Sequence, residues 1–482
     1  MDTEPRPTQS EAFTGPMRVL GRAVYRGPHL YSATPMIRIQ LDLGALENWP
    51  SDRLPGFNDR LLGLLPSLQR HGCSFGKPGG LVRRLRDGTW LGHVAEHVAL
   101  ELQTLAGTPT TRGKTRSVSG RPGVYNVMFE YAEEPVGLLA GCLALRLVDS
   151  LLPEELRGIE RLDRIGADDP GADAPFDFDL ALRDLQRLAR RSALGPSTRS
   201  LVDEARRRDI PVIRMDDFSL IQLGHGRHAK RIRASITGVT SYLAVEAAGD
   251  KDLTKTMLSA AGLPVPKGEV VRSAEAAVEA AEELGYPVVT KPLDGNQGRG
   301  VGIGLRTPEQ VRWGYEHAAP YSRRVVVEQH YEGSDHRILV VAGQVVAAAR
   351  RVPAHVVGDG HRSIAALVEE TNQDPRRGEG HEKGLTRIVI DEHVRELLAR
   401  SGLTTESVPE AGRMVQLRAT ANLSTGGTAV DCTDIIHPDN AAIARRAAKV
   451  IGLDVAGIDF IAPDIARPVR ETGGGIVEVN AA

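Results

Sequence analysis

The sequence has few cysteines and aromatic residues, and neither charge sign is in excess. Its three cysteines, Cys73, Cys142 and Cys432, are far apart. This spacing excludes a disulfide framework and indicates reduced thiols of a cytoplasmic protein. Lysine and arginine number 60 against 62 acidic residues, a net charge of −2. A nucleic-acid partner, which would need a basic surface, is therefore not expected.

Long hydrophobic runs are also missing. The most apolar stretch, 136–152, contains Arg146 and Asp149, so it predicts a buried amphipathic helix and no membrane partner. Residues 1–16 lack a basic-then-apolar signal pattern and are expected to form a disordered tail.

The length of 482 residues exceeds what one hydrophobic core usually serves, so two or three domains are expected. A first domain is predicted over 17–152, followed by a connector of low periodicity over 153–175. From 176 onward helices alternate with strands. The clearest of these segments are helices over 178–192 and 197–208 and a strand over 210–215.

Acidic and amide side chains at the end of the chain predict a magnesium site. Glu478 and Asn480 lie two residues apart in a β-rich run, so an extended backbone points both side chains to one face. Asp459 ends another apolar run and is expected on the neighbouring strand. Mg²⁺ prefers such oxygen ligands together with nucleotide phosphates.

Two lysines and a glycine-rich loop lie upstream. Lys251 follows Asp250, a predicted N-cap, and Lys291 closes an apolar strand before the loop 294–300. Glycines there let backbone N–H groups approach a triphosphate, while Lys291 and Arg299 supply positive charge. The spacing is not that of a Walker A loop.

Together these segments resemble the ATP-grasp superfamily, in which two α+β lobes clamp ATP. The alternative is an ordinary α/β domain with surface lysines and a turn-forming loop. The resemblance implies Mg²⁺ at Asp459, Glu478 and Asn480, an adenine hinge over 325–330, and ribose binding by Asp335. The implied nucleotide-binding residues are Lys251, Lys291, Asn296, Gly298, Arg299, Gly300, Glu328, Gln329 and Asp335.

Longer strings resemble the cyanophycin synthetase family over about 17–482. They include Lys291–Gly300, Ala348–His355, Asp374–Gly378, Leu417–Gly427 and His71–Ser74. The fold expected from this resemblance is an α/β and α+β multidomain protein. A small α+β N-terminal domain precedes an ATP-grasp domain over 176–482, with a pre-ATP part over 176–248 and clamping lobes over 249–482.

The sequence departs from the family pattern in places. Gln297 replaces a usual histidine, and His29 stands where asparagine is typical. Gln297 can still donate a hydrogen bond to a phosphate oxygen. Family members continue into a Mur-ligase-like half that adds arginine, and this half is expected to be absent here.

The resemblance implies a ligase that uses ATP to phosphorylate the C-terminal carboxylate of a poly-aspartate backbone and then adds L-aspartate. The implied partners are cyanophycin polymer or primer, L-aspartate and further copies of the chain in a homotetramer. Two alternatives stay open. One is a non-catalytic polymer-binding or assembly subunit, and the other is a stand-alone ligase for another amino acid or a dipeptide.

Arginines are candidate receivers for substrate carboxylates, because guanidinium groups pair with them bidentately. The candidates are Arg337, Arg350, Arg351 and Arg418, and those predicted to act in catalysis with Lys291 and Gln297 are Arg337 and Arg418. The loop 422–427 offers backbone N–H groups for an acyl phosphate. The stretch 374–382 is predicted to be either a mobile loop over the site or a solvated one.

A second candidate site lies in the N-terminal domain. His93, Glu96 and His97 follow the H-x-x-E-H order of inverted zinc peptidases and share one face of a helix. Candidate zinc ligands are His93, His97 and Glu101, with Glu96 as the base and Glu130 as another possible ligand. The alternative is a metal-free polar stripe. The family resemblance implies that this domain binds polymer or trims it to primers.

Overall fold

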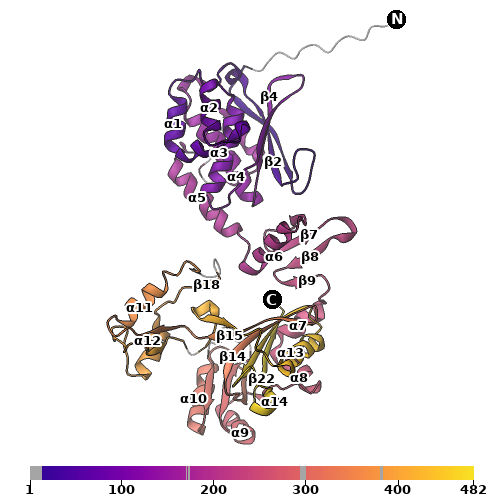
Figure 1. The fold of residues 1–482 in the computed structure, drawn as a ribbon, viewed down its shortest axis with the longest axis vertical. Helices are drawn as coiled ribbons and strands as arrows, with labels where there is room; N and C mark the ends of the chain where they lie inside the picture. Colours follow the sequence, from indigo (N-terminus) through magenta and orange to yellow (C-terminus); the bar gives the residue numbers. More distant parts are fainter. Residues whose placement is uncertain are drawn as a thin grey trace. The chain divides into compact units, whose positions relative to one another are not determined.

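The computed structural model describes residues 14–169, 171, 174–293, 300–379, 384–418 and 420–481. The chain divides into two compact units, coloured from indigo to yellow along the sequence in Figure 1. The first comprises Met1–Leu194, Ala205–Phe218 and Leu223–His225. The second comprises Gly195–Glu204, Ser219–Gln222 and Gly226–Ala482.

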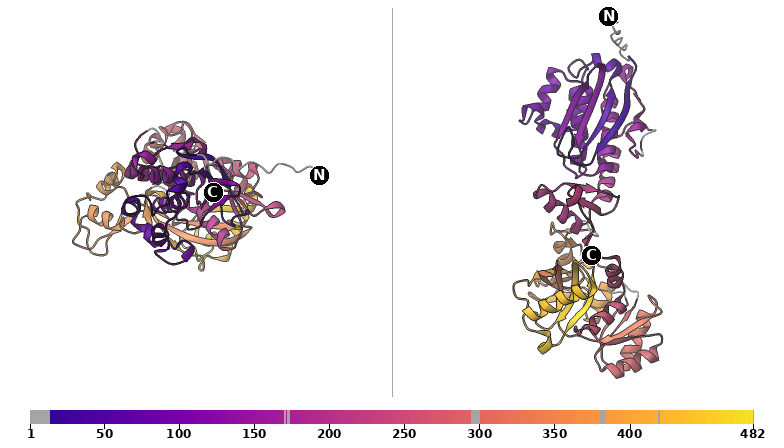
Figure 2. Two further views of the ribbon diagram at one scale, coloured as in Figure 1. Left: turned by 90° about the horizontal axis from the view of Figure 1, so that it is seen from above. Right: turned by 90° about the vertical axis from the view of Figure 1, so that its right-hand side faces the viewer.

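The first unit is built on a five-stranded sheet of order β3-β4-β2-β1-β5, antiparallel except for the parallel β1–β5 pair. Five helices lie to one side of it (Figures 1 and 2). The strands are β1 (Met17–Tyr25), β2 (Met36–Asp42), β3 (Gly113–Val118), β4 (Arg121–Glu130) and β5 (Ile159–Glu160). The helices are α1 (Phe57–Leu64), α2 (Gly80–Asp87), α3 (Leu91–Leu105), α4 (Glu134–Ser150) and α5 (Phe178–Ser192).

Helix α4 confirms the buried helix predicted over 136–152. Gly137 and Gly141, one turn apart, let it approach the sheet closely. A Cβ atom at Gly141 would lie 2.7 Å from the ring of Phe129, and one at Gly137 would lie 2.8 Å from Ile37. Contacts this short are sterically excluded, so glycine at these two positions sets the distance between helix and sheet.

The predicted connector and the helix after it belong to the first unit. Strand β5 pairs with β1, and Ile165 is fully buried. Helix α5 has the predicted bounds 178–192, but we had expected it in the ATP-grasp part. Leu185 and Ala189, one turn apart, form an apolar stripe that packs in the core of the first unit.

A further sheet has the order β6-β7-β8-β9, preceded by helix α6 (Pro196–Arg207), which matches the helix predicted over 197–208. Its strands are β6 (Val212–Arg214), β7 (Leu220–Leu223), β8 (Lys230–Arg233) and β9 (Ile236–Thr237). Strand β6 lies within the strand predicted over 210–215.

The second unit contains a four-stranded sheet of order β10-β13-β11-β12, packed against two helices around its own hydrophobic core. The strands are β10 (Gly268–Val271), β11 (Val288–Pro292), β12 (Gly302–Leu305) and β13 (Val325–Gln329), and the helices are α9 (Ala274–Leu284) and α10 (Pro308–Ala318).

A five-stranded sheet of order β20-β15-β14-β21-β22 forms another core of the second unit. Helices α7, α8 and α13 contribute to this core, and α14 adds a short turn beside it. The strands are β14 (Ser334–Val341), β15 (Gln344–Val352), β20 (Thr428–Asp431), β21 (Val455–Ala462) and β22 (Gly475–Asn480). The helices are α7 (Tyr242–Gly249), α8 (Lys251–Ala260), α13 (Pro438–Ile451) and α14 (Val469–Thr472).

A smaller core lies between β15 and β20 along the chain, where helices α11 and α12 pack with short strand pairs. Its elements are α11 (Ile364–Thr371), α12 (Glu392–Arg400), β16 (His355–Val357), β17 (Arg377–Gly378), β18 (Leu385–Thr386) and β19 (Met414–Gln416). Within the described residues, no helix is both long and apolar enough to cross a membrane.

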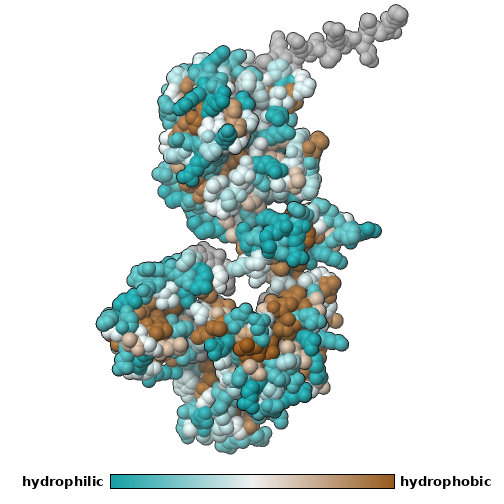
Figure 3. All heavy atoms as spheres, in the orientation of Figure 1, coloured by the Kyte–Doolittle hydropathy of each residue, from teal (hydrophilic) through white to brown (hydrophobic). Residues whose placement is uncertain are grey.

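Hydrophobic residues gather on the viewed face of the second unit around α7 (Figure 3). Val239 is 72% exposed and Leu243 is 74% exposed. Apolar surface of this kind is typical of contact surfaces. The homotetramer expected from the family resemblance stays a prediction.

Candidate functional sites

Helix α8 presents two lysines on one face. It begins as predicted: the Asp250 side chain accepts hydrogen bonds from the backbone N–H groups of Asp252 and Leu253. Lys251 and Lys255 lie four residues apart, so their side chains project from the same face. Lys251 was predicted from the sequence and Lys255 was not, although the two lie four residues apart in the same helix.

The Glu328 side chain lies between two ammonium groups. It is 2% exposed, and its carboxylate accepts hydrogen bonds from Lys255 Nζ and, at 2.6 Å, from Lys291 Nζ. Antiparallel pairing of β11 with β13 brings Lys291 opposite Val326, two residues from Glu328. The predicted phosphate lysine and the predicted hinge acid therefore meet in one buried cluster.

Burial lowers the pKa of both lysines. The pKa of Lys255 falls to about 8, with desolvation as the largest cause. The pKa of Lys291 falls well below its usual value through desolvation and the nearby ammonium groups of Lys255 and Lys251. The Glu328 carboxylate favours the charged lysines and opposes this shift. An anionic phosphate would favour the charged lysines in the same way.

The predicted metal residues lie on adjacent strands, as expected. Asp459 on β21 pairs in register with Glu478 on β22, and Asn480 follows two residues on. Lys251 Nζ lies 3.7 Å from Glu478 Oε1, which joins the lysine side of the site to the carboxylate side. Asn480 Nδ2 is buried and has no hydrogen-bond partner within the described part of the chain.

Two of the four candidate arginines contact Asp459. Arg337 Nη1 lies 2.8 Å from Asp459 Oδ1, and Arg351 Nη2 lies 2.9 Å from Asp459 Oδ2. Arg351 also donates to Asp335, whose pKa is raised chiefly by desolvation. Arg351 thus links Asp335 to Asp459, and the ribose-binding role expected for Asp335 stays a prediction. Arg350 is exposed.

The loop 422–427 is held by a buried arginine outside the predicted set. Arg377, 6% exposed, donates to the carbonyl oxygens of Thr386 and Gly426. Together with neighbouring residues, Arg377 and Gly426 line a cavity of about 380 Å³. Arg418 pairs with Asp391 at 2.7 Å, so no described contact brings it to Asp459.

Part of the predicted nucleotide loop lies outside the described residues. This applies to Asn296, Gln297, Gly298 and Arg299 and to the predicted mobile stretch at 380–382. Gly300 is described and has a φ of 68°. Gln329 closes β13, where its Oε1 accepts from the Lys267 backbone N–H. The roles of these residues stay predictions.

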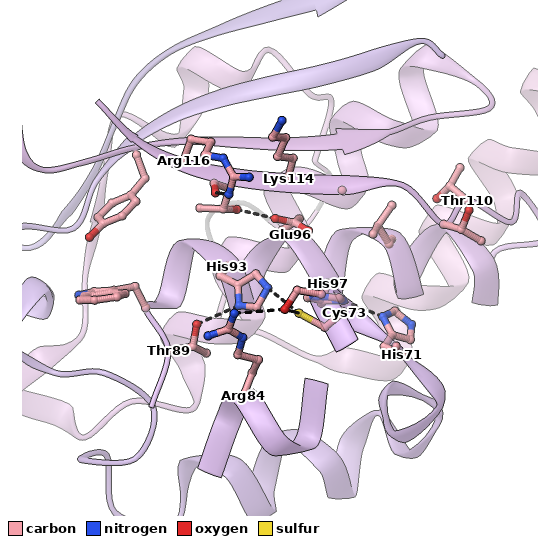
Figure 4. Close-up of a pocket in the computed structure, with 18 of the residues that line it drawn as sticks. His71, Cys73, Arg84, Thr89, His93, Glu96, His97, Thr110, Lys114 and Arg116 are labelled. Atoms are coloured by element: carbon pink, nitrogen blue, oxygen red, sulfur yellow. Dashed lines mark hydrogen bonds between the residues drawn. The ribbon is translucent and has the colours of Figure 1, made fainter. Parts of the chain in front are cut away.

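The first unit carries a separate pocket of about 690 Å³ (Figure 4). Helix α3 confirms the expected helix and brings His93, Glu96 and His97 to this pocket. A short turn places Cys73 beside them, so that ligand atoms of Cys73, His93 and His97 all lie within 4.8 Å of one another. Cys73 has a φ of 46°, a strained backbone for a residue other than glycine.

Burial shifts the pKa values in this pocket toward neutral side chains. The pKa of His93 falls to about 4 and that of His97 to about 3, mainly through desolvation. Desolvation also raises the pKa of Glu96 to about 7. Neutral imidazoles are the form that binds a metal ion, and a thiolate is a favourable zinc ligand. Cys73, His93 and His97 therefore fit a zinc site.

Glu101 is outside this cluster, which corrects its place among the zinc ligands. Its carboxylate accepts hydrogen bonds from Ser67 and from His71 instead. Glu130 is engaged elsewhere, by the backbone N–H groups of Thr111 and Arg112. The helix pattern could not identify Cys73, because a turn distant in sequence supplies it.

Two family models match the chain. The cyanophycin synthase-like N-terminal domain matches residues 38–153, and the ATP-grasp domain matches residues 246–334. A crystal structure of a bifunctional glutathione synthetase from Pasteurella multocida has a TM-score of 0.50 at 21% identity. The match covers 92% of this chain and 77% of the glutathione synthetase chain. The family model and the structural match show that the chain has an ATP-grasp fold. This fold implies binding of ATP and Mg²⁺.

Curated relatives give the more particular relationship. The cyanophycin synthetase of Trichormus variabilis is 48% identical over 469 residues, covering 97% of this chain and 50% of the relative. That of Crocosphaera subtropica is 46% identical over 471 residues, covering 97% and 52%. The chain is a homologue of the cyanophycin synthetases, and it spans about half the length of these relatives.

Proposed function

We propose that the chain is an ATP-dependent carboxylate–amine ligase that adds L-aspartate to the C-terminal carboxylate of a poly-aspartate backbone in cyanophycin. The observation that carries this proposal is that the lysines of helix α8 contact both the predicted metal residues and the predicted nucleotide residues. Lys251 bridges toward Glu478 on the metal side, while Lys255 and Lys291 share Glu328 on the nucleotide side.

The reaction needs an activated carboxylate, because oxide is a poor leaving group. A carboxylate oxygen of the primer attacks the γ-phosphorus of ATP, the bond to the β-phosphate oxygen breaks, and ADP leaves. The aspartate amine then attacks the acyl carbon of the resulting acyl phosphate. Phosphate departs, the amine loses a proton and the peptide bond is complete. Positioning and charge neutralisation supply most of the catalysis in such transfers.

The residues of the site fit the two tasks of neutralising phosphate charge and positioning the substrates. Lys251 and Lys291 would neutralise phosphate charge, and Asp459, Glu478 and Asn480 would hold Mg²⁺, which supplies further neutralisation of the phosphates when bound. Arg337 and Arg351 contact Asp459, and we expect the guanidinium group of Arg337 to receive a carboxylate or phosphate oxygen of the substrate. The backbone N–H groups of Leu423 and Ser424 would face the acyl phosphate, since those of Thr425, Gly426 and Gly427 donate within the loop.

ADP release by the purified full chain tests this proposal. The assay contains Mg²⁺, ATP, L-aspartate and a short cyanophycin primer ending in a free carboxylate. We expect ADP to depend on both aspartate and primer, and the primer to gain the mass of one aspartate. Lys291→Ala should abolish turnover, and Lys449→Ala, an exposed lysine on α13, serves as the matched control.

Two other outcomes would replace this function. ADP formed only with a different amino acid or with a dipeptide would identify a stand-alone ligase of other specificity. ATP and polymer binding without turnover would identify a polymer-binding or assembly subunit. Sizing the same preparation by light scattering would test the expected tetramer, for which the exposed surface around α7 is a candidate contact.

A second candidate function is metal-dependent hydrolysis of the polymer in the first unit. The cluster of Cys73, His93 and His97 favours it, and Glu96 lines the same pocket. The raised pKa of Glu96 suits a general base near neutral pH. Incubating the full chain with polymer and Zn²⁺ but without ATP should shorten the polymer. A zinc-selective chelator that leaves Mg²⁺ free, or the variant Glu96→Gln, should stop this hydrolysis while aspartate addition continues.

A further inference from the structure

We propose that Glu101 and His71 are positioning residues that hold His97 in the tautomer required for metal binding, through a continuous hydrogen-bond relay. This inference rests on the metal site proposed above. Glu101 thus gains a role different from the direct ligation that its place on the helix had predicted.

The relay consists of three consecutive contacts. Ser67 Oγ donates to Glu101 Oε1, Glu101 Oε2 lies 2.7 Å from His71 Nε2, and His71 Nδ1 lies 2.9 Å from His97 Nδ1. Side-chain exposure is 5% for Glu101 and 17% for His71. Figure 4 shows His71 directed at His97 on the floor of the pocket. Bulk water therefore does not replace these partners.

The chemistry of each atom sets the direction of the relay. The pKa of Glu101 is lowered, with the His71 hydrogen bond as the largest cause, so its carboxylate is ionised and can only accept. His71 must therefore carry a proton on Nε2. In neutral His71, Nδ1 is then an acceptor, and the proton between the two rings belongs to His97 Nδ1. That proton leaves His97 Nε2 as a lone pair, the form in which an imidazole binds a metal ion.

His93 shows the same arrangement with a different partner. Its Nδ1 lies 2.9 Å from Thr89 Oγ1, while its Nε2 lies 3.3 Å from Cys73 Sγ. Both imidazoles of the cluster are therefore engaged at Nδ1 by groups outside it. Outer partners of this kind orient ligating histidines, and removing one typically weakens metal binding about 10- to 100-fold.

The first test measures metal affinity directly. The full chain is stripped with chelator and titrated with Co²⁺ and then with Zn²⁺ in competition, following the sulfur-to-cobalt absorption. Glu101→Gln and His71→Phe should weaken both metals about 10- to 100-fold. Glu155→Gln, an exposed carboxylate in the same unit, should change nothing. Cys73→Ser should remove the sulfur band and thereby confirm the site itself.

The second test reads the tautomer without metal. Histidine-selective ¹⁵N NMR of the stripped full chain, assigned with His97→Asn, should show His97 protonated at Nδ1. Glu101→Gln should lower the fraction of His97 protonated at Nδ1. A glutamine, unlike a carboxylate, can present either its NH₂ group or its carbonyl oxygen to His71 Nε2, so the His71 proton is no longer held at Nε2 alone.

The outcomes separate the relay from the site. Unchanged metal affinity in both variants, or His97 protonated at Nε2 in the wild type, would overturn the relay while leaving the metal site standing. Failure of the wild type to take up either metal would overturn both. Every variant should retain the calorimetric transition of the first unit, which shows that this unit is folded, and aspartate addition in the second unit should persist.

Discussion

Among single residues of the ligase site, Glu328 is held from two sides, because its buried carboxylate pairs with the ammonium groups of Lys255 and Lys291. Lys255→Met would leave Glu328 paired with Lys291 alone and would hold that lysine away from phosphate. We expect kcat/KM for ATP to fall roughly tenfold to hundredfold, the equivalent of about 1.5–3 kcal/mol for a charged hydrogen bond.

Steady-state ADP release over a range of ATP concentrations measures this effect. Lys449→Met, an exposed lysine on α13, is the matched control and should retain wild-type kinetics. If Lys255→Met retained wild-type kinetics as well, Glu328 would not couple the two lysines.

Glu96 gives a pH-dependent prediction. Its pKa is raised from 4.5 to about 7, so the folded chain holds a proton that the unfolded chain has released between these pH values. The stability that protonated Glu96 contributes is present below about pH 4.5 and is lost as pH rises through 7. A shift of this size corresponds to at most about 3 kcal/mol.

Urea unfolding of chelator-stripped wild type and Glu96→Gln measures this difference. The free energy of unfolding of the wild type, relative to the variant, should decrease from pH 5 to pH 8. His93 and His97, whose lowered pKa values act in the opposite direction below about pH 6.5, remain in both proteins and cancel in the subtraction. A constant difference across this range would contradict the raised pKa.

Individual site residues were predictable where their spacing along one element reports their geometry. Glu478 and Asn480 share a strand face, and His93 and His97 share a helix face, so local periodicity placed them. Cys73 and His71, the partner of Glu101, come from a turn region distant in sequence from helix α3. Arg377 comes from strand β17, distant in sequence from the loop 422–427 that it holds. No local period encodes such contacts, which is why the sequence suggested Glu101 as a ligand and left His71 without a role.

At the scale of elements, Arg377 connects strand β17 to the loop 422–427. Arg377→Met would remove this donor from the buried carbonyl oxygen of Gly426 and from the half-buried one of Thr386, at a cost of about 1–3 kcal/mol for the buried acceptor. We expect faster amide exchange over 422–427 and a lower kcat for aspartate addition, with little change in KM for ATP.

The neighbouring arginine provides the control for this prediction. The Arg376 side chain is 75% exposed and pairs with Asp374, so Arg376→Met should alter neither exchange nor kcat. Hydrogen exchange followed by mass spectrometry reads the loop directly. If the two substitutions had equal effects, Arg377 would act through its positive charge and not through its hydrogen bonds to the carbonyl oxygens.

Element bounds followed closely from capping and periodicity. Asp250 gave the start of α8, and α5 has the bounds that its apolar stripe predicted. Which core a helix joins is a different question. An amphipathic helix such as α5 carries the same pattern whichever neighbour covers it, so the sequence did not show that Leu185 and Ala189 complete the first unit.

At the scale of the whole molecule, the two compact units predict separable unfolding. Leu185 is fully buried in the core of the first unit, whereas Leu180 on the same helix is 44% exposed. Leu185→Ala should cost about 2–5 kcal/mol through lost burial and the cavity left behind. For a unit of this size the melting temperature of its transition should fall by about 5–15 °C. Leu180→Ala should shift it little.

Calorimetry with and without Mg²⁺ and ATP assigns the transitions, since a ligand stabilises only the unit that binds it. The nucleotide should raise the melting temperature of the second unit. It should not change the melting temperature of the transition that Leu185→Ala lowers. If Leu185→Ala lowered the nucleotide-sensitive transition instead, α5 would stabilise the ATP-grasp unit. The boundary first expected near residue 176 would then describe the molecule better than the one after Leu194.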